Sequence, residues 1–202
     1  MIINNLNEYL KTIMNLKAIY NNINLKLLKI NDQEFIEKLL LIRNEENVRN
    51  FMFDNKIIDK NYHIKWIKNK IISRSRIFYL VFYRNELIGC VVLSNISNEK
   101  KIADWAFYIT EKAMRGIGAV LEYKFLNMIF KQEQYNIINC VVLNINKSVI
   151  KLHEKFGFKT KNHYKKNFIL RNNKKIEFTS LFLERKSWET EINPSFKNRF
   201  IE

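Results

Sequence analysis

Two glycines mark a place where the backbone itself can bind a ligand. Gly116 and Gly118 are two of only 4 glycines among 202 residues, and they precede a run whose apolar residues have the spacing of a buried helix face. The first N–H groups of a helix lack partners and attract anions, and glycine leaves them uncovered. With Arg115 beside them, these glycines predict a phosphate or pyrophosphate site; an ordinary flexible loop is the alternative interpretation.

The neighbouring residues exclude two other phosphate-binding folds. A P-loop has Lys-Ser or Lys-Thr after its last glycine, whereas Ala119 and Val120 follow Gly118. A dinucleotide-binding fold alternates parallel strands with helices. The apolar runs before the glycines, at 77–83, 86–96 and 102–109, are instead separated by short polar segments, which predicts an antiparallel meander.

The remaining patterns predict the other elements of a single α+β domain. We expect a strand at 24–30, helices at 31–44, 59–72 and 116–131, a buried strand at 136–143, a helix capped by Asn146 and ended by Gly157, and a basic C-terminal hairpin with its turn at 172–175. The domain is expected to span 23–190, between an N-terminal extension at 1–22 and a loose tail at 191–202.

Composition narrows the class of protein. Cys90 and Cys140 lie inside apolar runs, which indicates buried free thiols in a reducing cytoplasm. No apolar stretch is long enough to span a membrane and no signal peptide is evident, so we expect a cytoplasmic protein. The net charge of +15 comes from scattered lysines without a zinc-finger or RRM signature. The basic surface therefore suits a small phosphate-bearing substrate better than nucleic acid.

The order of these elements resembles the GNAT superfamily of N-acetyltransferases. "RGIGAV" is similar to its Arg/Gln-x-x-Gly-x-Gly/Ala signature, although Val120 stands where glycine or alanine is usual. The resemblance implies a central mixed, mostly antiparallel sheet flanked by helices, with acetyl-CoA as co-substrate and no metal. It implies that backbone amides of Arg115, Gly116, Ile117, Gly118 and Ala119 hold the pyrophosphate, while the backbone of Phe107, Tyr108 and Ile109 pairs with the pantetheine arm. It also implies that Asn146 contacts this arm, and an N-cap role explains that residue equally well.

The same resemblance gives His153 a candidate catalytic role. "NKSVIKLHEKFGF" is similar to the superfamily pattern Asn-x-x-Ala-x-x-x-Tyr-x-x-x-Gly-Phe, with His153 at the tyrosine position. In many members that tyrosine protonates the departing CoA thiolate. A histidine with a pKa near neutrality would serve as the same general acid. The alternative is a packing residue at the edge of the core.

The acetyl acceptor is suggested by residues 41–67, which resemble the acetyltransferase family of pseudaminic acid biosynthesis. The resemblance extends over about 24–188 and implies acetylation of the 4-amino group of a UDP-linked 4-amino-4,6-dideoxy sugar, a step toward flagellin glycosylation. It implies a nucleotide-sugar pocket of Arg43, Met52, Phe53 and His63. Val141 stands where some relatives have a glutamate, so a base is absent there, and Asp104 is a weak substitute.

Two other functions stay open at this point. A ribosomal-protein or other peptide N-terminal acetyltransferase would need an acidic groove, which a charge of +15 argues against. A non-catalytic, basic GNAT-like module would bind nucleic acid. The 3 histidines and 2 cysteines have no metal-ligand spacing. We expect a small-molecule partner, no nucleic acid and no membrane, and leave a homodimer open.

Overall fold

A computed structural model describes residues 15–132, 135–161 and 167–201 and places a mixed sheet at the centre of the molecule. Its strands are β1 (Ile23–Leu27), β2 (Arg76–Tyr83), β3 (Glu86–Ser97), β4 (Ile102–Ile109), β5 (Ile137–Leu143), β6 (Lys159–Thr160), β7 (Phe168–Arg171) and β8 (Lys174–Glu184). They lie in the order β1-β2-β3-β4-β5-β8-β6, and β7 pairs with β8 outside this path. All neighbouring pairs are antiparallel except β4 and β5. The predicted meander of β2, β3 and β4 is confirmed.

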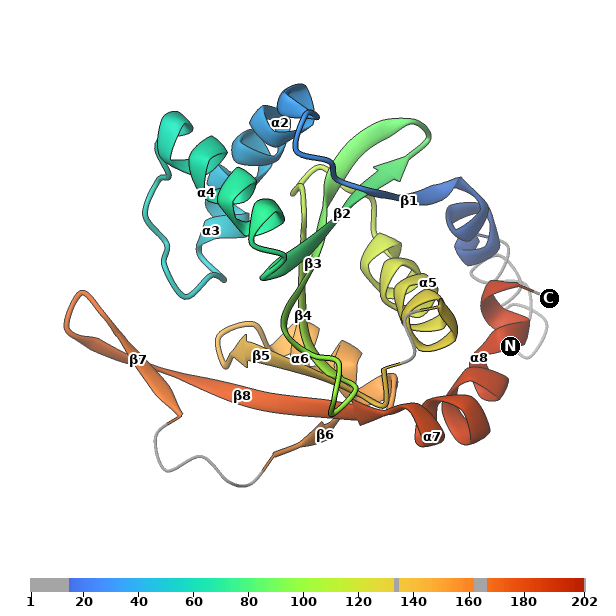
Figure 1. Ribbon diagram of the computed structural model, residues 1–202. Coiled ribbons are helices and arrows are strands. Elements are labelled where there is room, and N and C mark those ends of the chain that lie inside the picture. Colours follow the sequence, from blue (N-terminus) through green and yellow to red (C-terminus); the bar gives the residue numbers. More distant parts are fainter. Residues whose placement is uncertain (1–14, 133–134, 162–166, 202) are drawn as a thin grey trace, which may run out of the picture.

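Helices cover both faces of this sheet, as Figure 1 shows. They are α2 (Gln33–Asn44), α3 (Glu46–Arg49), α4 (Lys60–Ile72), α5 (Ile117–Gln132), α6 (Lys147–Lys155), α7 (Arg185–Ser187), the π-helical η1 (Trp188–Ile192) and α8 (Asn193–Phe200). Side chains of β2 alternate between the two cores that result. Tyr79 and Val81 pack with α5, and Phe78 and Leu80 pack with α2 and α4. The centre of the sheet is therefore buried on both faces, and the α+β GNAT fold expected from the sequence is confirmed.

The parallel pair of β4 and β5 is short, and this creates the site. Only Ile102–Asp104 pairs with Ile137–Asn139. Beyond Asp104 the remaining residues of β4 no longer pair with β5, and cavities line the gap. This edge of β4 keeps backbone N–H and C=O groups that need a partner.

Both ends of the described chain pack more closely than the sequence predicts. The expected loose tail is wrong for α8, because Phe200 is 3% exposed and stacks on Tyr123 of α5 with 4.5 Å between ring centroids. The helical segment 15–22 also joins the core, where Ile19 is fully buried. Apolar side chains one helical turn apart give each segment a face that covers α5. Residues 1–14 of the predicted extension lie outside the described part.

Two local predictions also need correction. Asn146 occupies the N-cap position of α6, but its side chain makes no capping bond; its Oδ1 accepts a hydrogen bond from Ser148 Oγ at 3.1 Å. The short strand β6 was not expected. The hairpin between β7 and β8 does turn at Asn172 and Asn173, whose φ values of 49° and 61° are those of a type I′ turn.

Gly89 offers a test of how tightly β3 approaches β4. A Cβ at this position would overlap the carbonyl oxygen of Tyr108 and stand 2.8 Å from Cα of Ile109. We expect Gly89→Ala to lower the free energy of unfolding by about 1–3 kcal/mol, because the backbone of two packed strands must shift. Urea denaturation measures this change. Gly118→Ala is the matched control, since a Cβ there meets only Leu152 Cδ2 at 4.0 Å; equal destabilisation of both variants would contradict the expectation.

Candidate active site

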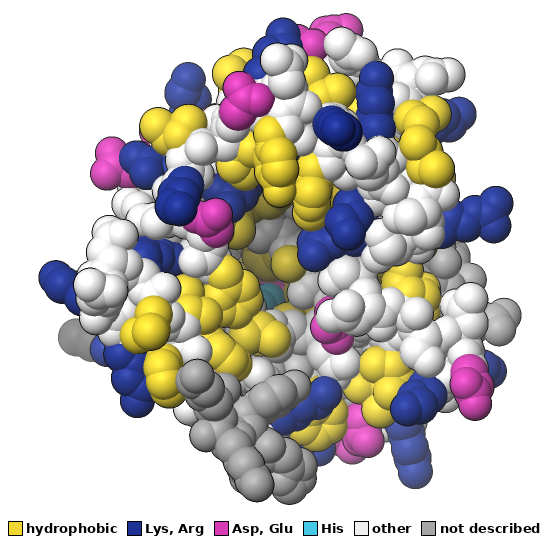
Figure 2. Space-filling view, turned by 60° about the vertical axis from the view of Figure 1, so that its left-hand side comes forward, with side chains coloured by type: hydrophobic (Ala, Val, Ile, Leu, Met, Phe, Trp, Pro, Cys, Tyr) yellow, Lys and Arg dark blue, Asp and Glu magenta, His cyan; other side chains and the backbone are white. Residues whose placement is uncertain are grey.

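The gap between β4 and β5 brings several predicted cofactor residues together. A cavity of about 290 Å³ is lined by Phe107, Tyr108, Ile109 and Asn146. A smaller one of about 120 Å³ is lined by Phe107, Asn146 and His153, with Cys140 and Val141 of β5 on its other side. Figure 2 shows a hollow rimmed by hydrophobic side chains, with a histidine in its depth. The open edge of β4 and this apolar cleft fit an extended chain that hydrogen-bonds to the backbone, such as a pantetheine arm.

Helix α5 begins eight residues after the end of β4, and its start has the properties of an anion site. The N–H groups of Ile117 and Val120 donate to the carbonyls of Met114 and Gly116. Among the described residues, the N–H groups of Gly118 and Ala119 have no backbone partner. Gly116 has a φ of +98°, which side-chain-bearing residues rarely adopt. These free amides, the helix dipole and the exposed Arg115 fit the predicted pyrophosphate site.

His153 lies buried beside the cleft and is paired with a carboxylate. Its Nδ1 is 2.7 Å from Oε1 of Glu122 on α5, and the side chains are 3% and 0% exposed. Burial on its own would lower the pKa of His153, but the charge and hydrogen bond of Glu122 reverse that effect and raise it to about 10. The pKa near neutrality expected from the sequence is therefore corrected. Burial also raises the pKa of Glu122, and the charge and hydrogen bond of His153 counteract that effect. The ring faces the cavity that Trp105, Phe107 and Cys140 also line.

A second pocket contains all four predicted acceptor residues. Arg43, Met52, Phe53 and His63 line a cavity of about 370 Å³ on the face of the sheet that carries α2 and α4. Tyr62, Trp66, Phe78 and Tyr108 supply aromatic walls, and Arg76 stacks over Trp66 at 5.1 Å. Met52 and Ala106 line both this pocket and the small cavity at His153. The acceptor pocket therefore adjoins the cleft between β4 and β5.

Two buried polar atoms of this acceptor pocket, one a hydrogen-bond donor and the other an acceptor, have no partner in the described part of the chain. Burial, together with the nearby charge of Arg43, lowers the pKa of His63 to about 4, so the ring is neutral. The ring hydrogen-bonds to the backbone of Ile36, while its buried Nε2 has no partner among the described residues. Nδ1 must therefore make that bond, which leaves Nε2 as an acceptor. Arg43 Nη2 donates to the carbonyl of Asp54 at 2.9 Å, and its buried Nη1 is an unused donor within the described part of the chain.

Three arginines fix the loop that separates the two sites, and two of them, Arg49 and Arg171, were missed by the sequence analysis. Arg171, at the end of β7, donates to the carbonyls of Asn50 (3.0 Å) and Met52. Arg43 and Arg49 donate to the carbonyls of Asp54 and Asn55. Hydrogen bonds from these arginines to backbone carbonyls thus hold the loop that carries Met52 and Phe53. No signal in the sequence links Arg171 to this loop, because 121 residues separate it from Asn50.

Glu45 is another residue that the sequence analysis missed. Its carboxylate accepts hydrogen bonds from Thr110 Oγ1 (2.7 Å) and the N–H of Glu111 (2.8 Å). Asn47 adds a bond to the Glu111 carboxylate at 2.6 Å. The end of β4 is therefore anchored to the corner between α2 and α3.

Asp104 of β4 is hydrogen-bonded to side chains of both neighbouring strands. Its carboxylate accepts hydrogen bonds from Asn95 Nδ2 (2.6 Å) and Asn139 Nδ2 (2.9 Å), at the last residue pair that joins β4 to β5. Val141 lines the small cavity with an apolar side chain. The carboxylate that some relatives place on β5 thus has no counterpart at Val141.

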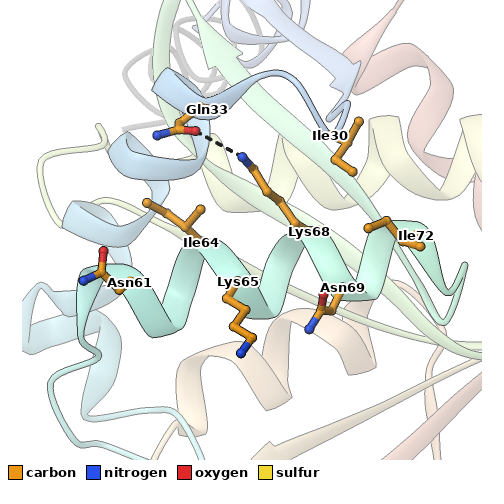
Figure 3. Close-up of a pocket in the computed structure, with 8 residues that line it drawn as sticks. All are labelled: Ile30, Gln33, Asn61, Ile64, Lys65, Lys68, Asn69 and Ile72. Carbon is orange, nitrogen blue, oxygen red and sulfur yellow. Dashed lines mark hydrogen bonds between the residues drawn. The ribbon is translucent and has the colours of Figure 1, made fainter.

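Another cavity lies away from this chemistry. It has a volume of about 490 Å³ and is formed by α4 with Ile30 and Gln33. Figure 3 shows Lys65 and Asn69 on its α4 side and the bond from Lys68 Nζ to Gln33 Oε1, 3.1 Å long. Its described polar lining consists of lysines and amides without an acid, a nucleophile or a buried unpaired group. It is a surface groove rather than a reaction site.

Three further features concern the cysteines, membrane-spanning helices and metal sites. Cys90 and Cys140 are free and buried, as predicted. In the described part of the chain no helix is long and apolar enough to cross a membrane. The same residues contain no cluster of three His, Cys, Asp or Glu side chains able to hold a metal ion.

Comparison with known proteins agrees with this geometry. Residues 25–179 match the family described as Acetyltransferase (GNAT) domain. The Acetyltransferase PseH of Campylobacter jejuni is 26% identical over 130 residues, which cover 64% of this chain and 80% of that relative.

Solved structures extend the similarity of the fold. Spermidine N-acetyltransferase from Vibrio cholerae, in complex with CoA and spermine, has a TM-score of 0.73 at 19% identity and covers 84% of this chain and 99% of its own. A dodecameric form of that enzyme has a TM-score of 0.68 at 18% identity, covering 84% and 98%. At these identities the structures show the fold alone. The family match spans well over half of the chain, its fold is that of solved acetyltransferases, and its cleft fits CoA, so the protein belongs to the GNAT family and is an acetyltransferase that uses acetyl-CoA.

Proposed function

We propose that this enzyme acetylates the 4-amino group of a UDP-linked 4-amino-4,6-dideoxy sugar, as in pseudaminic acid biosynthesis. The observation that carries the proposal is the acceptor pocket, where Arg43 Nη1 and His63 Nε2 have no partner among the described residues and lie among aromatic walls. One free donor and one free acceptor complement the imide edge of uracil, which offers the opposite pair. The similarity to the Acetyltransferase PseH of Campylobacter jejuni is consistent with acetyl transfer and supports the resemblance from which this acceptor is proposed.

The charge of the pocket separates this acceptor from a polyamine or a basic peptide. Arg43 and Arg76 line it, and Asp54 is the only acidic residue among its described lining. A diphosphate would be attracted by these guanidinium groups, whereas a polyamine or a basic peptide would add like charge to them. The spermidine acetyltransferases share the fold with this chain, and the pocket's chemistry favours an anionic acceptor.

The proposed reaction is direct transfer within the cleft. The neutral amine of the sugar attacks the thioester carbonyl, whose oxygen accepts hydrogen bonds from the open edge of β4. A water chain takes up the amine proton, since Val141 offers no base. His153 protonates the thiolate that leaves.

The first test measures ligand protection. We expect UDP in the millimolar range to raise the melting temperature, by about 5–10 °C at 100 times its Kd. Arg43→Ala should abolish most of this shift because it removes the free donor. Arg74→Ala is the control, since Arg74 is exposed and lies outside the acceptor pocket. Differential scanning fluorimetry with UDP, spermine and a basic peptide gives the comparison. A shift with spermine or the peptide but none with UDP would overturn the proposed substrate and leave acetyl-CoA chemistry intact.

A further inference from the structure

Glu122 is a buried carboxylate that the reaction described so far leaves unexplained. It lies on the face of α5 that otherwise packs apolar side chains, and it is 0% exposed. Burying a carboxylate costs several kcal/mol unless a partner compensates for it. Its Oε1 bonds to His153 Nδ1 at 2.7 Å, while its buried Oε2 has no partner among the described residues. The histidine is therefore the partner that the described structure gives this charge.

Apart from Glu122, the described groups that face the His153 ring are uncharged. From β4, the rings of Trp105 and Phe107 lie 5.5 and 6.3 Å from the imidazole, and Phe158 lies at 5.1 Å. From β5, the Cys140 side chain hydrogen-bonds to the ring. Burial raises the pKa of this thiol, so it stays neutral. The Glu122 carboxylate on α5 is the acid that faces the imidazole in the described part of the chain.

We propose that Glu122 is a positioning residue that holds His153 as an imidazolium, whose Nε2–H lies beside the Cys140 thiol in the small cavity that both residues line. The proposal rests on the proposed role of His153 as general acid. With Nδ1–H donated to the carboxylate, Nε2 is the nitrogen left to carry a proton to the thiolate. Proton transfer from Nε2 to sulfur leaves a neutral imidazole that still donates Nδ1–H to Glu122. The amine loses one proton when the amide forms, and this proton restores the imidazolium, so the cycle is balanced.

This pairing explains how a histidine can replace a tyrosine. A free imidazole has a pKa of about 6.5 and is mostly neutral at pH 7, whereas a phenol near 10 stays protonated. The Glu122 charge raises the pKa of His153 to about 10, which brings it close to a phenol. Without the charge of Glu122, burial would be the largest remaining influence on His153, and burial lowers the pKa of the ring.

The test compares Glu122→Gln in two backgrounds, one with His153 and one with His153→Tyr. With His153 present, we expect Glu122→Gln to lower the single-turnover rate at pH 8 at least about tenfold, within the range for general acid catalysis, with CoA affinity unchanged. The rate should also begin to fall at a lower pH. In the His153→Tyr background the same change should alter the rate less than about threefold, because the phenol needs no carboxylate. The nearly isosteric glutamine limits misfolding, and circular dichroism with CoA titration checks each variant.

A second readout does not depend on turnover. NMR of the histidine ring should show His153 protonated at pH 8 in the parent and neutral in Glu122→Gln. Identical titration in both proteins, or equal rate losses in both backgrounds, would overturn the proposal. If His153→Phe reacts as fast as the parent, the general-acid role fails instead, and the NMR shift still reports on the pair. The two failures are therefore distinguishable.

Discussion

Gly118→Glu should abolish useful binding of CoA while the protein stays folded. The residue precedes the free amide of Ala119 at the start of α5, where the pyrophosphate is expected. A carboxylate there would oppose a like charge, which costs several kcal/mol, and each 1.4 kcal/mol lowers affinity tenfold. We expect the Kd for CoA to rise by about a hundredfold to a thousandfold on this basis. Isothermal titration calorimetry measures it directly.

Gly118→Ala separates charge from bulk in this experiment. Space around Gly118 is open, because a Cβ added there would lie 4.0 Å from Leu152 Cδ2 of α6, so the alanine variant should bind CoA nearly as the parent does. The melting temperature of both variants should stay close to that of the parent. Unchanged CoA binding by Gly118→Glu would place the pyrophosphate elsewhere and remove the role assigned to this helix start.

His153→Phe should lower kcat by about tenfold to a thousandfold, the range for loss of a general acid. His153→Tyr should keep substantial activity, because a phenol with a pKa of about 10 also stays protonated at neutral pH and can donate its proton. The pKa of His153 is raised to about 10, so its proton is present at neutral pH and is lost only as the pH rises through about 10. The parent rate should therefore hold through neutral pH and fall on the alkaline side.

Single-turnover measurements keep product release from masking this effect. A parent profile that falls near pH 6.5 would show that the pair with Glu122 does not raise the pKa in solution. Equal rates for His153→Phe and the parent at every pH would make His153 a packing residue, with water protonating the thiolate.

Much of the fold could be predicted because its signals are local. The runs of β2, β3 and β4 alternate between two cores and are joined by short turns, and α5 has a continuous 3.6-residue period. The errors lie where packing over distance decides the structure. Phe200 is buried because the rings of Tyr123 and Phe156 lie against it, and no pattern within the tail shows which distant rings it will meet. The Asn146 side chain is of a type that often caps helices, but its Oδ1 accepts a hydrogen bond from Ser148 Oγ instead of capping α6.

Some residues of the candidate site could likewise be predicted from the sequence, and others could not. The anion site at Gly118 is predicted by the glycines at a helix start. The backbone site at Phe107 and the acceptor residues Arg43, Met52, Phe53 and His63 are implied by family resemblance alone. Glu122 had a readable signal, since a carboxylate on the apolar face of a helix needs a buried partner. That partner, His153, lies 31 residues away. Its perturbed pKa could not be predicted from sequence, because the shift depends on burial and on a 2.7 Å contact.

The bond from Arg171 to the loop at Asn50 and Met52 also has a consequence for biosynthesis. Domains emerge from the ribosome N-terminal part first. The loop is translated early together with Arg43 and Arg49, but Arg171, which binds its Asn50 and Met52 carbonyls, is added 121 residues after Asn50. A nascent chain that already contains β4 and α5 therefore lacks the Arg171 anchor for its acceptor loop until β7 has been made. Premature termination before Arg171 would therefore leave the loop with its bonds from Arg43 and Arg49 but without the anchor at Asn50 and Met52.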